Sequence, residues 1–260
     1  MNLLKTKEFI VNWISQYSTK HGIKKLVVGI SGGIDSSLTS TLCALSGINT
    51  IVVSMPIHQR KNELQNANTH INWLLQKHKN VNTLHLDLTH LFEEYKKLIP
   101  IELHSDLGFA NSRARLRMTT LYQISSCDNG IVVGTGNKIE DFGIGFFTKY
   151  GDGGVDISPI ADLTKTEVRK LAEFCGVNPT IINTPPTDGL WPDGRTDESQ
   201  IGATYAELEY VMNLENNCNL NNRQKKVFEI YNALNKKNQH KMVPIPVCKV
   251  PKKYLKISNS

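Results

Sequence analysis

The chain lacks a long apolar run. None of its 260 residues belongs to a stretch that approaches the roughly 18 apolar residues a membrane-spanning helix needs. The N-terminus, MNLLKTKEFIVNWIS, alternates charged and apolar residues, so it predicts an amphipathic helix and not a signal peptide. With 40% hydrophobic and 21% charged residues, the composition is typical of a soluble globular protein without membrane partners.

Cysteine and histidine occur without the spacings of a structural site. The five cysteines are odd in number and widely scattered, and neither C-x-x-C nor H-x-x-x-H occurs. This pattern argues against a disulfide framework and against a zinc site. It favours reduced thiols, packed as small apolar groups, and therefore a protein of the cytoplasm.

The formal net charge is +6 and the sequence pI is near 9.0. A nucleic-acid surface is one explanation, but the basic residues are dispersed along the chain. An anionic small substrate, or no functional meaning at all, accounts for the charge equally well.

Strand-like and helix-like segments alternate through the first half of the chain. Short apolar, β-branched runs predict strands at 24–30, 50–56, 81–88 and 130–136. Helical spacing predicts helices at 34–46, 62–78, 88–98 and 110–127. Because the strands are nearly continuously apolar, we expect a doubly wound α/β fold with a mainly parallel, Rossmann-like sheet and helices on both faces.

The character changes after Gly136. Residues 137–161 are rich in Gly and Asp and show no period, and a helix is predicted at 164–176, opened by Thr164 and closed by Gly176. Residues 184–199 are dense in Pro, Gly and Asp and predict a functional loop. Helices are predicted at about 199–213 and 222–239. Since no repeat or low-complexity linker occurs, we expect residues 1–260 to form one domain.

The stretch GISGGIDSSL (29–38) stands between a predicted strand and a predicted helix, where backbone N–H groups and the helix dipole hold anions. It matches neither the Walker A loop, which needs a lysine, nor G-x-G-x-x-G. Asp35 would repel phosphate unless a cation stands between them, which points to Mg²⁺. The alternative is a Gly-Ser turn whose aspartate merely favours the first helical turn.

Several segments together resemble a known family. SGGIDSS (31–37) resembles the pyrophosphate loop of the N-type ATP pyrophosphatases, which release pyrophosphate from ATP and leave an adenylated substrate. Four further segments resemble the NAD synthetases and occur in the same order along the chain as in that family. They are NSRARLRM (111–118), the block GTGNKIEDFGIGFFTKYGDGGVDISPIADLTKTEV (134–168), PPTDGLWPDGRTDESQIGATYAELE (185–209) and HKMVPIP (240–246).

The resemblance implies an adenine nucleotide α-hydrolase-like fold and the amidation of a carboxylate. In that family, deamido-NAD reacts with ATP to an NAD-adenylate and pyrophosphate, and ammonia then gives NAD and AMP. The substrate carboxylate is itself the nucleophile, so the chemistry needs alignment and charge neutralisation. The absence of a convincing Ser-His-Asp or Cys-His arrangement agrees with this. The resemblance also implies a homodimer with substrate sites near the subunit interface, and no nucleic-acid partner.

By position, the resemblance assigns roles to individual residues. Asp35 and Glu140 match the Mg²⁺ ligands and, with Lys165, form the catalytic set. A lysine suits this task as a mobile point charge. ATP contacts match Gly29, Ile30, Ser31, Gly32, Gly33, Ile34, Asp35, Ser36, Thr135, Lys165 and Thr187. Deamido-NAD contacts match Arg115, Lys149, Asp156, His240 and Lys241.

The sequence departs from the family pattern in one place. Between Glu140 and GFFTKYG it has one residue more than the commonest spacing, which leaves Asp141 as the alternative to Glu140 as metal ligand. We prefer Glu140 because it keeps its offset from Thr135. Whether Gln59 or Arg60 contacts adenine stays open.

Two other functions compete with this assignment. One is another N-type ATP pyrophosphatase, either the synthetase subunit of an amidotransferase or a tRNA thiolase, and the high pI is the only support for the thiolase. A non-catalytic nucleotide sensor would be expected to have lost Asp35, Glu140 or Lys165, and all three are present. Longer members of the family carry a glutaminase domain. Since 260 residues leave no room for one, we expect free ammonia, or ammonia from another protein, as the nitrogen source.

Overall fold

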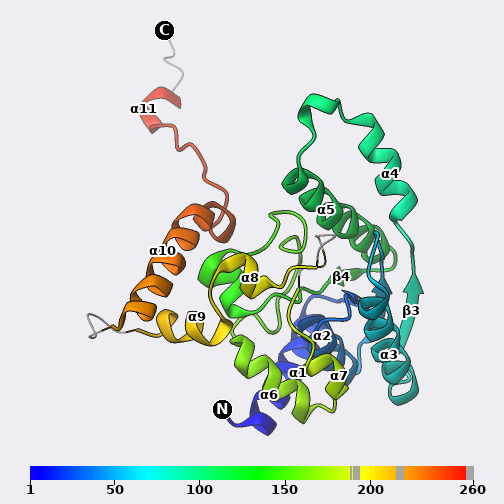
Figure 1. Cartoon of the computed structure of the whole chain (residues 1–260). Helices are drawn as coiled ribbons and strands as arrows, with labels where there is room; N and C mark the ends of the chain where they lie inside the picture. The colour runs from blue at the N-terminus through cyan, green and yellow to red at the C-terminus, as the bar shows by residue number, and fades with distance from the viewer. Residues whose placement is uncertain (188, 190–193, 215–219, 256–260) are drawn as a thin grey trace.

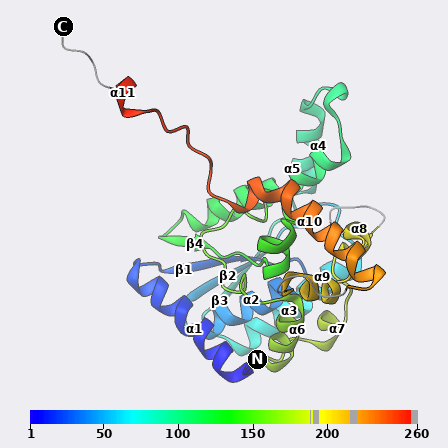
Figure 2. The ribbon, with the colours of Figure 1, turned by 90° about the vertical axis from the view of Figure 1, so that its left-hand side faces the viewer.

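The computed structural model describes residues 1–187, 189, 194–214 and 220–255. Within these residues, four strands form one parallel sheet in the order β3-β2-β1-β4, as Figures 1 and 2 show. The strands are β1 (Lys25–Gly29), β2 (Asn49–Ser54), β3 (Val81–His85) and β4 (Gly130–Val132). The predicted parallel α/β architecture is confirmed, although β3 and β4 end earlier than expected.

One face of the sheet is covered by α1 (Leu3–Lys20), α2 (Ile34–Leu45), α3 (Lys61–Lys77) and α6 (Lys165–Phe174). Leu26 and Val28 of β1 are fully buried in the apolar cluster that these helices share. Apolar side chains at helical spacing, among them Leu38 and Leu171, complete the cluster. In this layer the N-terminus of α2 lies close to the N-terminus of α6, at the edge where the carboxyl ends of the strands lie.

The other face is covered by α4 (Thr89–Leu98) and α5 (Asp106–Ser125). Val27, which alternates with Leu26 and Val28 along β1, packs here with Phe92 and Leu121. The end of α4, the 3₁₀ turn η1 (Ile101–Leu103) and the start of α5 form an arm that stands away from the body of the molecule (Figures 1 and 2).

A third apolar cluster joins four of the helices that follow β4. It contains the π-helix η2 (Ile139–Ile144), α8 (Asp197–Ile201), α9 (Tyr205–Met212) and α10 (Asn222–Met242). The short helices α7 (Pro179–Ile182) and α11 (Lys252–Leu255) lie outside it, and an extended tail leads from α10 to α11, away from the body (Figure 1). Among the described helices, none is long and apolar enough to cross a membrane.

Two predicted helices differ from the structure for local reasons. The helix expected at 199–213 is two helices, because Gly202 ends α8 in the left-handed region at φ +82°. α5 begins earlier than expected, because the Ser105 side chain caps it by accepting from the Gly108 N–H. The π-helix η2 and α7 lie in segments for which no helix was predicted. That the whole chain is one domain stays a prediction.

Candidate active site

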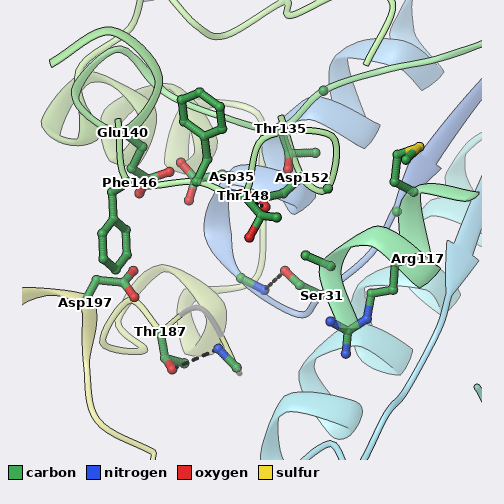
Figure 3. Close-up of a pocket in the computed structure, with 18 of the residues that line it drawn as sticks. Ser31, Asp35, Arg117, Thr135, Glu140, Phe146, Thr148, Asp152, Thr187 and Asp197 are labelled. Carbon is green, nitrogen blue, oxygen red and sulfur yellow. Dashed lines mark hydrogen bonds between the residues drawn. The ribbon is translucent and has the colours of Figure 1, made fainter. Parts of the chain in front are cut away.

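The phosphate loop lies where the sequence predicts it, between the carboxyl end of β1 and the start of α2. Gly32 has φ +88°, and a Cβ there would stand 2.4 Å from the backbone oxygen of Glu63. The Ser31 hydroxyl accepts from the Gly33 N–H at 3.1 Å, which Figure 3 shows, and the Ser36 hydroxyl donates to the Gly33 carbonyl at 3.0 Å. The loop is therefore preformed, with the α2 N-terminus available to an anion.

Lys165 joins the two carboxylates that the sequence assigns to the metal. Its ammonium donates to Asp35 Oδ2 at 2.6 Å and to Glu140 Oε1 at 3.0 Å. The lysine is 2% exposed, whereas the two acids keep 17% and 16% of their side chains exposed. Burial alone would lower the pKa of Lys165, but the adjacent carboxylates hold that pKa above its usual value. The site therefore brings together three charges from α2, η2 and α6.

Two neutral side chains hold these carboxylates in place. The fully buried Asn137 donates from Nδ2 to Asp35 Oδ1 at 3.1 Å, and its own oxygen accepts from the Glu140 N–H at 3.2 Å. Tyr205 donates from its hydroxyl to Glu140 Oε1 at 2.5 Å. Each acid thus has a fixed partner besides Lys165, and neither Asn137 nor Tyr205 was singled out from the sequence.

The π-helix η2 lies where the sequence has its extra residue. A π turn adds one residue to a helical turn and so accommodates such an insertion without moving the flanking segments. Asp141, the second residue of the pair, turns toward Gly136, where a Cβ would come within 2.2 Å of its carboxylate oxygens. Burial, together with the charge of Glu140, raises the pKa of Asp141 to about 8. It is Glu140, and not Asp141, that Lys165 links to Asp35.

The donor set fits Mg²⁺. Asp35 and Glu140 are close enough to share one ammonium, and Mg²⁺ in phosphate-transfer sites commonly takes one or two carboxylates plus phosphate oxygens. Across the part of the chain that the structure describes, no group of three or more His, Cys, Asp or Glu side chains gathers as an all-protein metal cage. A metal held here would need the phosphates of a bound nucleotide.

These groups line one cavity of about 750 Å³. Figure 3 shows Asp35, Glu140 and Thr135 around it, with Thr187 and Ser31 on its walls. Most predicted site residues line this cavity: Gly29, Ile30, Ser31, Gly32, Gly33, Ile34, Asp35, Arg115, Thr135, Glu140, Lys149, Lys165, Thr187, His240 and Lys241. The cavity therefore unites residues from the whole length of the chain.

Two predicted contacts stand apart from this lining. The Ser36 hydroxyl lies beneath the loop, bonded to Ser31 and Gly33. Asp156 accepts from the Val132 N–H at 2.7 Å and from the Tyr122 hydroxyl at 3.1 Å, so its carboxylate ties the following loop to β4. Neither Ser36 nor Asp156 is among the residues that line the cavity in this structure.

A basic wall lies at the end formed by α5, the 145–155 loop and α10. Arg115 donates from Nε to the Lys149 carbonyl at 3.3 Å, and Lys149 Nζ donates to the His240 carbonyl at 2.8 Å. Lys241 donates to the carbonyls of Gly145 and Phe147, both at 2.8 Å. Burial, assisted by Lys237, lowers the pKa of Lys241. The predicted dinucleotide contacts Arg115, Lys149, His240 and Lys241 thus form one connected group.

Arg117 is a half-buried cavity residue that sequence reasoning missed. From spacing alone, the arginines of α5 suggest a solvated basic face, but Arg117 donates to the Met55 carbonyl and to Gln59 Oε1, each at 2.9 Å. Burial, followed by the charge of Arg113, lowers the pKa of Arg117 to about 10. Gln59 lines the cavity and stays one of the two candidates for the adenine contact.

Thr187 lies in the described part of the predicted functional loop and lines the cavity. Its hydroxyl donates to the Arg195 carbonyl at 3.3 Å and accepts from the Gly189 N–H at 3.2 Å (Figure 3). Residues 188 and 190–193 of the predicted functional loop lie outside the described residues. The described part places Thr187 on the cavity wall.

Comparison with known proteins decides the family. The family model for NAD synthase matches residues 6–244. The chain belongs to the NAD synthase family. Two curated members of that family, both NH(3)-dependent NAD(+) synthetases, show how close the relation is. The one from Methanococcoides burtonii is 39% identical over 82% of this chain and 80% of its own length. The one from Alkaliphilus metalliredigens is 40% identical over 80% of this chain and 86% of its own.

A solved structure supports the same family relation. The NMN synthetase from Francisella tularensis superimposes with a TM-score of 0.85 at 28% sequence identity, covering 96% of this chain and 99% of its own. The expected fold class is confirmed by this likeness, as is the expected family.

Proposed function

We propose that this chain is an ammonia-dependent NAD synthetase, which amidates deamido-NAD at the expense of ATP and releases AMP and pyrophosphate. The observation that carries the proposal is the Lys165 ammonium between Asp35 and Glu140, beside a preformed phosphate loop. Family membership supports the same reaction, because the curated relatives are named for it.

Charge neutralisation is the main task of the site. ATP and the acid substrate are both anionic, so a carboxylate can attack the α-phosphorus only if cations offset the repulsion. Asp35 and Glu140 would hold Mg²⁺ together with the nucleotide phosphates, and the ion would supply that neutralisation. Lys165, freed from the two acids, would follow the pyrophosphate as it leaves, since a lysine on a flexible stem acts as a mobile point charge.

The two ends of the cavity suit two nucleotide substrates. We assign ATP to the loop 29–36, Thr135 and Thr187. We assign the acid substrate to the basic group of Arg115, Lys149, His240 and Lys241, because positive side chains there would face its phosphates. Asp156 would act on this end from behind, through the backbone that it ties to β4.

A homodimer is proposed as the working form. The arm between α4 and α5 exposes Leu98, Ile101, Leu103 and Leu107, each at least 64% accessible. Contiguous exposed apolar side chains of this kind mark interaction sites. A second copy of the chain would cover them. We place the enzyme in the cytoplasm, where the thiols would stay reduced, because every described cysteine is free.

The proposal is tested by pyrophosphate release. Purified protein with ATP, Mg²⁺, ammonium and deamido-NAD should release pyrophosphate and form NAD in equal amounts. The control omits deamido-NAD. Release no faster than in that control would overturn the proposal.

A second acid substrate has support from one observation. The solved structure with a TM-score of 0.85 is that of an NMN synthetase, which by its name makes the mononucleotide amide. Nicotinate mononucleotide is therefore assayed beside deamido-NAD under identical conditions. The ratio of the two kcat/KM values decides between the substrates. We expect the dinucleotide to win, since the curated relatives that match most of this chain are NAD synthetases.

The metal assignment has a matched pair of variants. Glu140→Gln removes the carboxylate that shares Lys165 with Asp35, whereas Asp141→Asn alters the neighbouring acid that faces Gly136. We expect Glu140→Gln and Asp35→Asn to lower turnover at least 100-fold. Asp141→Asn should retain most of the activity. The reverse order for the two neighbouring acids would transfer the ligand role to Asp141.

A further inference from the structure

Tyr205 carries a hydroxyl where packing alone needs only a ring. It is the first residue of α9 and 2% exposed, inside the apolar cluster with Ile139, Leu208 and Val227. A buried hydroxyl is costly unless it is hydrogen-bonded. This one points out of the cluster toward the cavity, where it meets two carboxylates from different segments.

The hydroxyl has one proton and two possible acceptors. Glu140 Oε1 lies at 2.5 Å and Asp197 Oδ2 at 3.2 Å, so the proton goes to Glu140. A phenol is protonated at neutral pH, so the Tyr205 hydroxyl is the donor and the Glu140 carboxylate is the acceptor. A bond from a neutral donor to an ionised carboxylate is of the stronger kind.

The bond fixes one particular oxygen of Glu140. Oε1 accepts from Tyr205 and from Lys165 together. The other oxygen, Oε2, takes part in none of the hydrogen bonds described for this carboxylate. The arrangement locks the rotation of the carboxylate and leaves Oε2 as the oxygen available to a cation beside Asp35.

The position of the phenol is itself rigid. The Tyr205 N–H donates to Glu198 Oε1 at 2.9 Å, and Thr204 caps α9 in a reciprocal pair with Glu207. The Tyr205 ring also lies under the Lys165 ammonium, 4.7 Å from ring centroid to nitrogen. Because the start of α9 is fixed in this way, the Tyr205 hydroxyl can hold the Glu140 carboxylate within a narrow range of positions.

We infer that Tyr205 is a positioning residue, which acts through Glu140 on the affinity and placement of the metal ion. The inference rests on the proposed function in one respect, since it takes Glu140 to be a metal ligand. Residues that hydrogen-bond to metal ligands fix ligand orientation, and their loss commonly weakens metal binding or activity by 10- to 100-fold. Lys165 can leave for the phosphates during turnover, whereas the Tyr205 hydroxyl remains on Glu140.

Tyr205→Phe isolates the hydroxyl. The phenylalanine keeps the ring in the apolar cluster and the ring face beneath Lys165. It removes only the hydroxyl, which donates to Glu140 and lies 3.2 Å from Asp197 Oδ2. Tyr231→Phe is the matched control, because Tyr231 packs against the same cluster. Thermal unfolding and circular dichroism establish that both variants fold like the unchanged protein.

The experiment measures Mn²⁺ binding by electron paramagnetic resonance. The nucleotide present is α,β-methylene-ATP, which the enzyme cannot cleave between the α- and β-phosphorus atoms. We expect Tyr205→Phe to raise the Kd for Mn²⁺ about 10-fold or more, and Tyr231→Phe to leave it within twofold of the original value. In turnover, the Mg²⁺ concentration at half-maximal rate should rise for Tyr205→Phe while the KM for the acid substrate stays unchanged.

A double-mutant cycle tests that Tyr205 acts through Glu140. In the Glu140→Gln background, adding Tyr205→Phe should change the Mn²⁺ Kd by less than twofold, because the carboxylate through which Tyr205 would act on the ion is already gone. An unaltered Mn²⁺ Kd in the single Tyr205→Phe variant would overturn the inference. The inference would also be overturned if Tyr205→Phe raised the Mn²⁺ Kd as much in the Glu140→Gln background as in the original protein. It would be overturned as well if the unchanged protein did not bind Mn²⁺. Failure to form NAD would overturn the proposed function alone, since Mn²⁺ binding is measured without catalysis.

Discussion

Behind the phosphate loop, α2 and α3 share a buried polar pair, Ser40 and His70. His70 is 1% exposed and its Nε2 lies 2.9 Å from the Ser40 hydroxyl, which itself donates to the Ser36 carbonyl at 2.8 Å. The ring therefore donates from Nε2. Its Nδ1 is buried without a hydrogen-bond partner among the described atoms. A protonated ring would expose a second N–H to that apolar surrounding, so burial lowers the pKa of His70 to about 4.

This lowered pKa predicts acid sensitivity of the fold. Between the ordinary value of 6.5 and about 4, the unfolded chain binds a proton at His70 that the folded chain does not. The free energy of unfolding should therefore fall as the pH falls through this window, by about 1.4 kcal/mol per pH unit. His70→Leu should remove this contribution, and His90→Gln, an exposed histidine of α4, should not.

Urea unfolding at several pH values from 4.5 to 7.5 measures the effect. Subtracting the curve of His70→Leu from that of the original protein cancels the contributions of the carboxylates, which titrate alike in both. A difference that stays flat across the window would contradict the assignment of a neutral, buried His70.

Most site residues could be predicted from the sequence, and the exceptions have a common cause. Asp35, Glu140 and Lys165 stand in distinctive strings, and the structure brings them together. Tyr205 and Arg117 stand in ordinary helical patterns, where a tyrosine suggests apolar packing and an arginine suggests a solvated face. Their partners, Glu140 and the Met55 carbonyl, lie 65 and 62 positions away in the chain, so only the folded geometry reveals them.

At the scale of elements, helix starts decide where the charges of the site lie. Thr164 caps α6 in a reciprocal pair with Glu167, accepting from its N–H at 3.4 Å and donating its own N–H to Glu167 Oε2 at 2.9 Å. Lys165 is the next residue, so the cap fixes the direction in which its side chain leaves the helix. An ammonium in the first turn of a helix is unfavourable for the dipole. The two carboxylates offset this.

Thr164→Ala should therefore have two effects. Loss of the cap should lower the free energy of unfolding by about 1 kcal/mol. It should also lower turnover severalfold, because Lys165 loses its fixed origin. Asn221→Ala is the matched control: Asn221 caps α10 in the same reciprocal way with Gln224, and neither residue lines the cavity. Urea unfolding and kcat are measured on both.

Asn221→Ala should lower the free energy of unfolding by the same amount as Thr164→Ala and should leave kcat unchanged. Equal loss of kcat in the two variants would show that the effect of Thr164→Ala is general destabilisation and not the placement of Lys165.

The elements themselves were predictable to different degrees. Strands with continuous apolar runs, such as β1, and helices with a clear cap, such as α6, are found where the sequence indicates them. The π-helix η2 was not predictable, because a 3.6-residue period does not describe it and Gly143 weakens any helical pattern. The break at Gly202 was visible in the sequence but did not outweigh the apolar spacing on either side.

At the scale of the whole molecule, the arm between α4 and α5 is the feature that a lone copy leaves unexplained. Its tip exposes Leu98 at 78% and Ile101 at 77%, on a segment that stands away from the body (Figure 2). Exposed side chains of this size cost solubility unless another surface covers them. A stable interface between two copies typically buries about 1,600 Å² in total, and an arm that packs against its counterpart is a direct way to reach such an area.

The homodimer predicts the effect of charges at the tip. Ile101→Glu with Leu103→Glu should place two charges on each copy inside the interface and halve the mass found by light scattering after size exclusion. Phe9→Glu, which changes an equally exposed apolar residue of α1 at 72%, should leave the mass unchanged. Because the substrate sites are expected near the interface, the charged arm should also raise the KM for the acid substrate. If the arm variant stays dimeric, or if Phe9→Glu dissociates the dimer, the interface lies on another surface. If the unchanged protein is monomeric at micromolar concentration, the homodimer proposal is wrong.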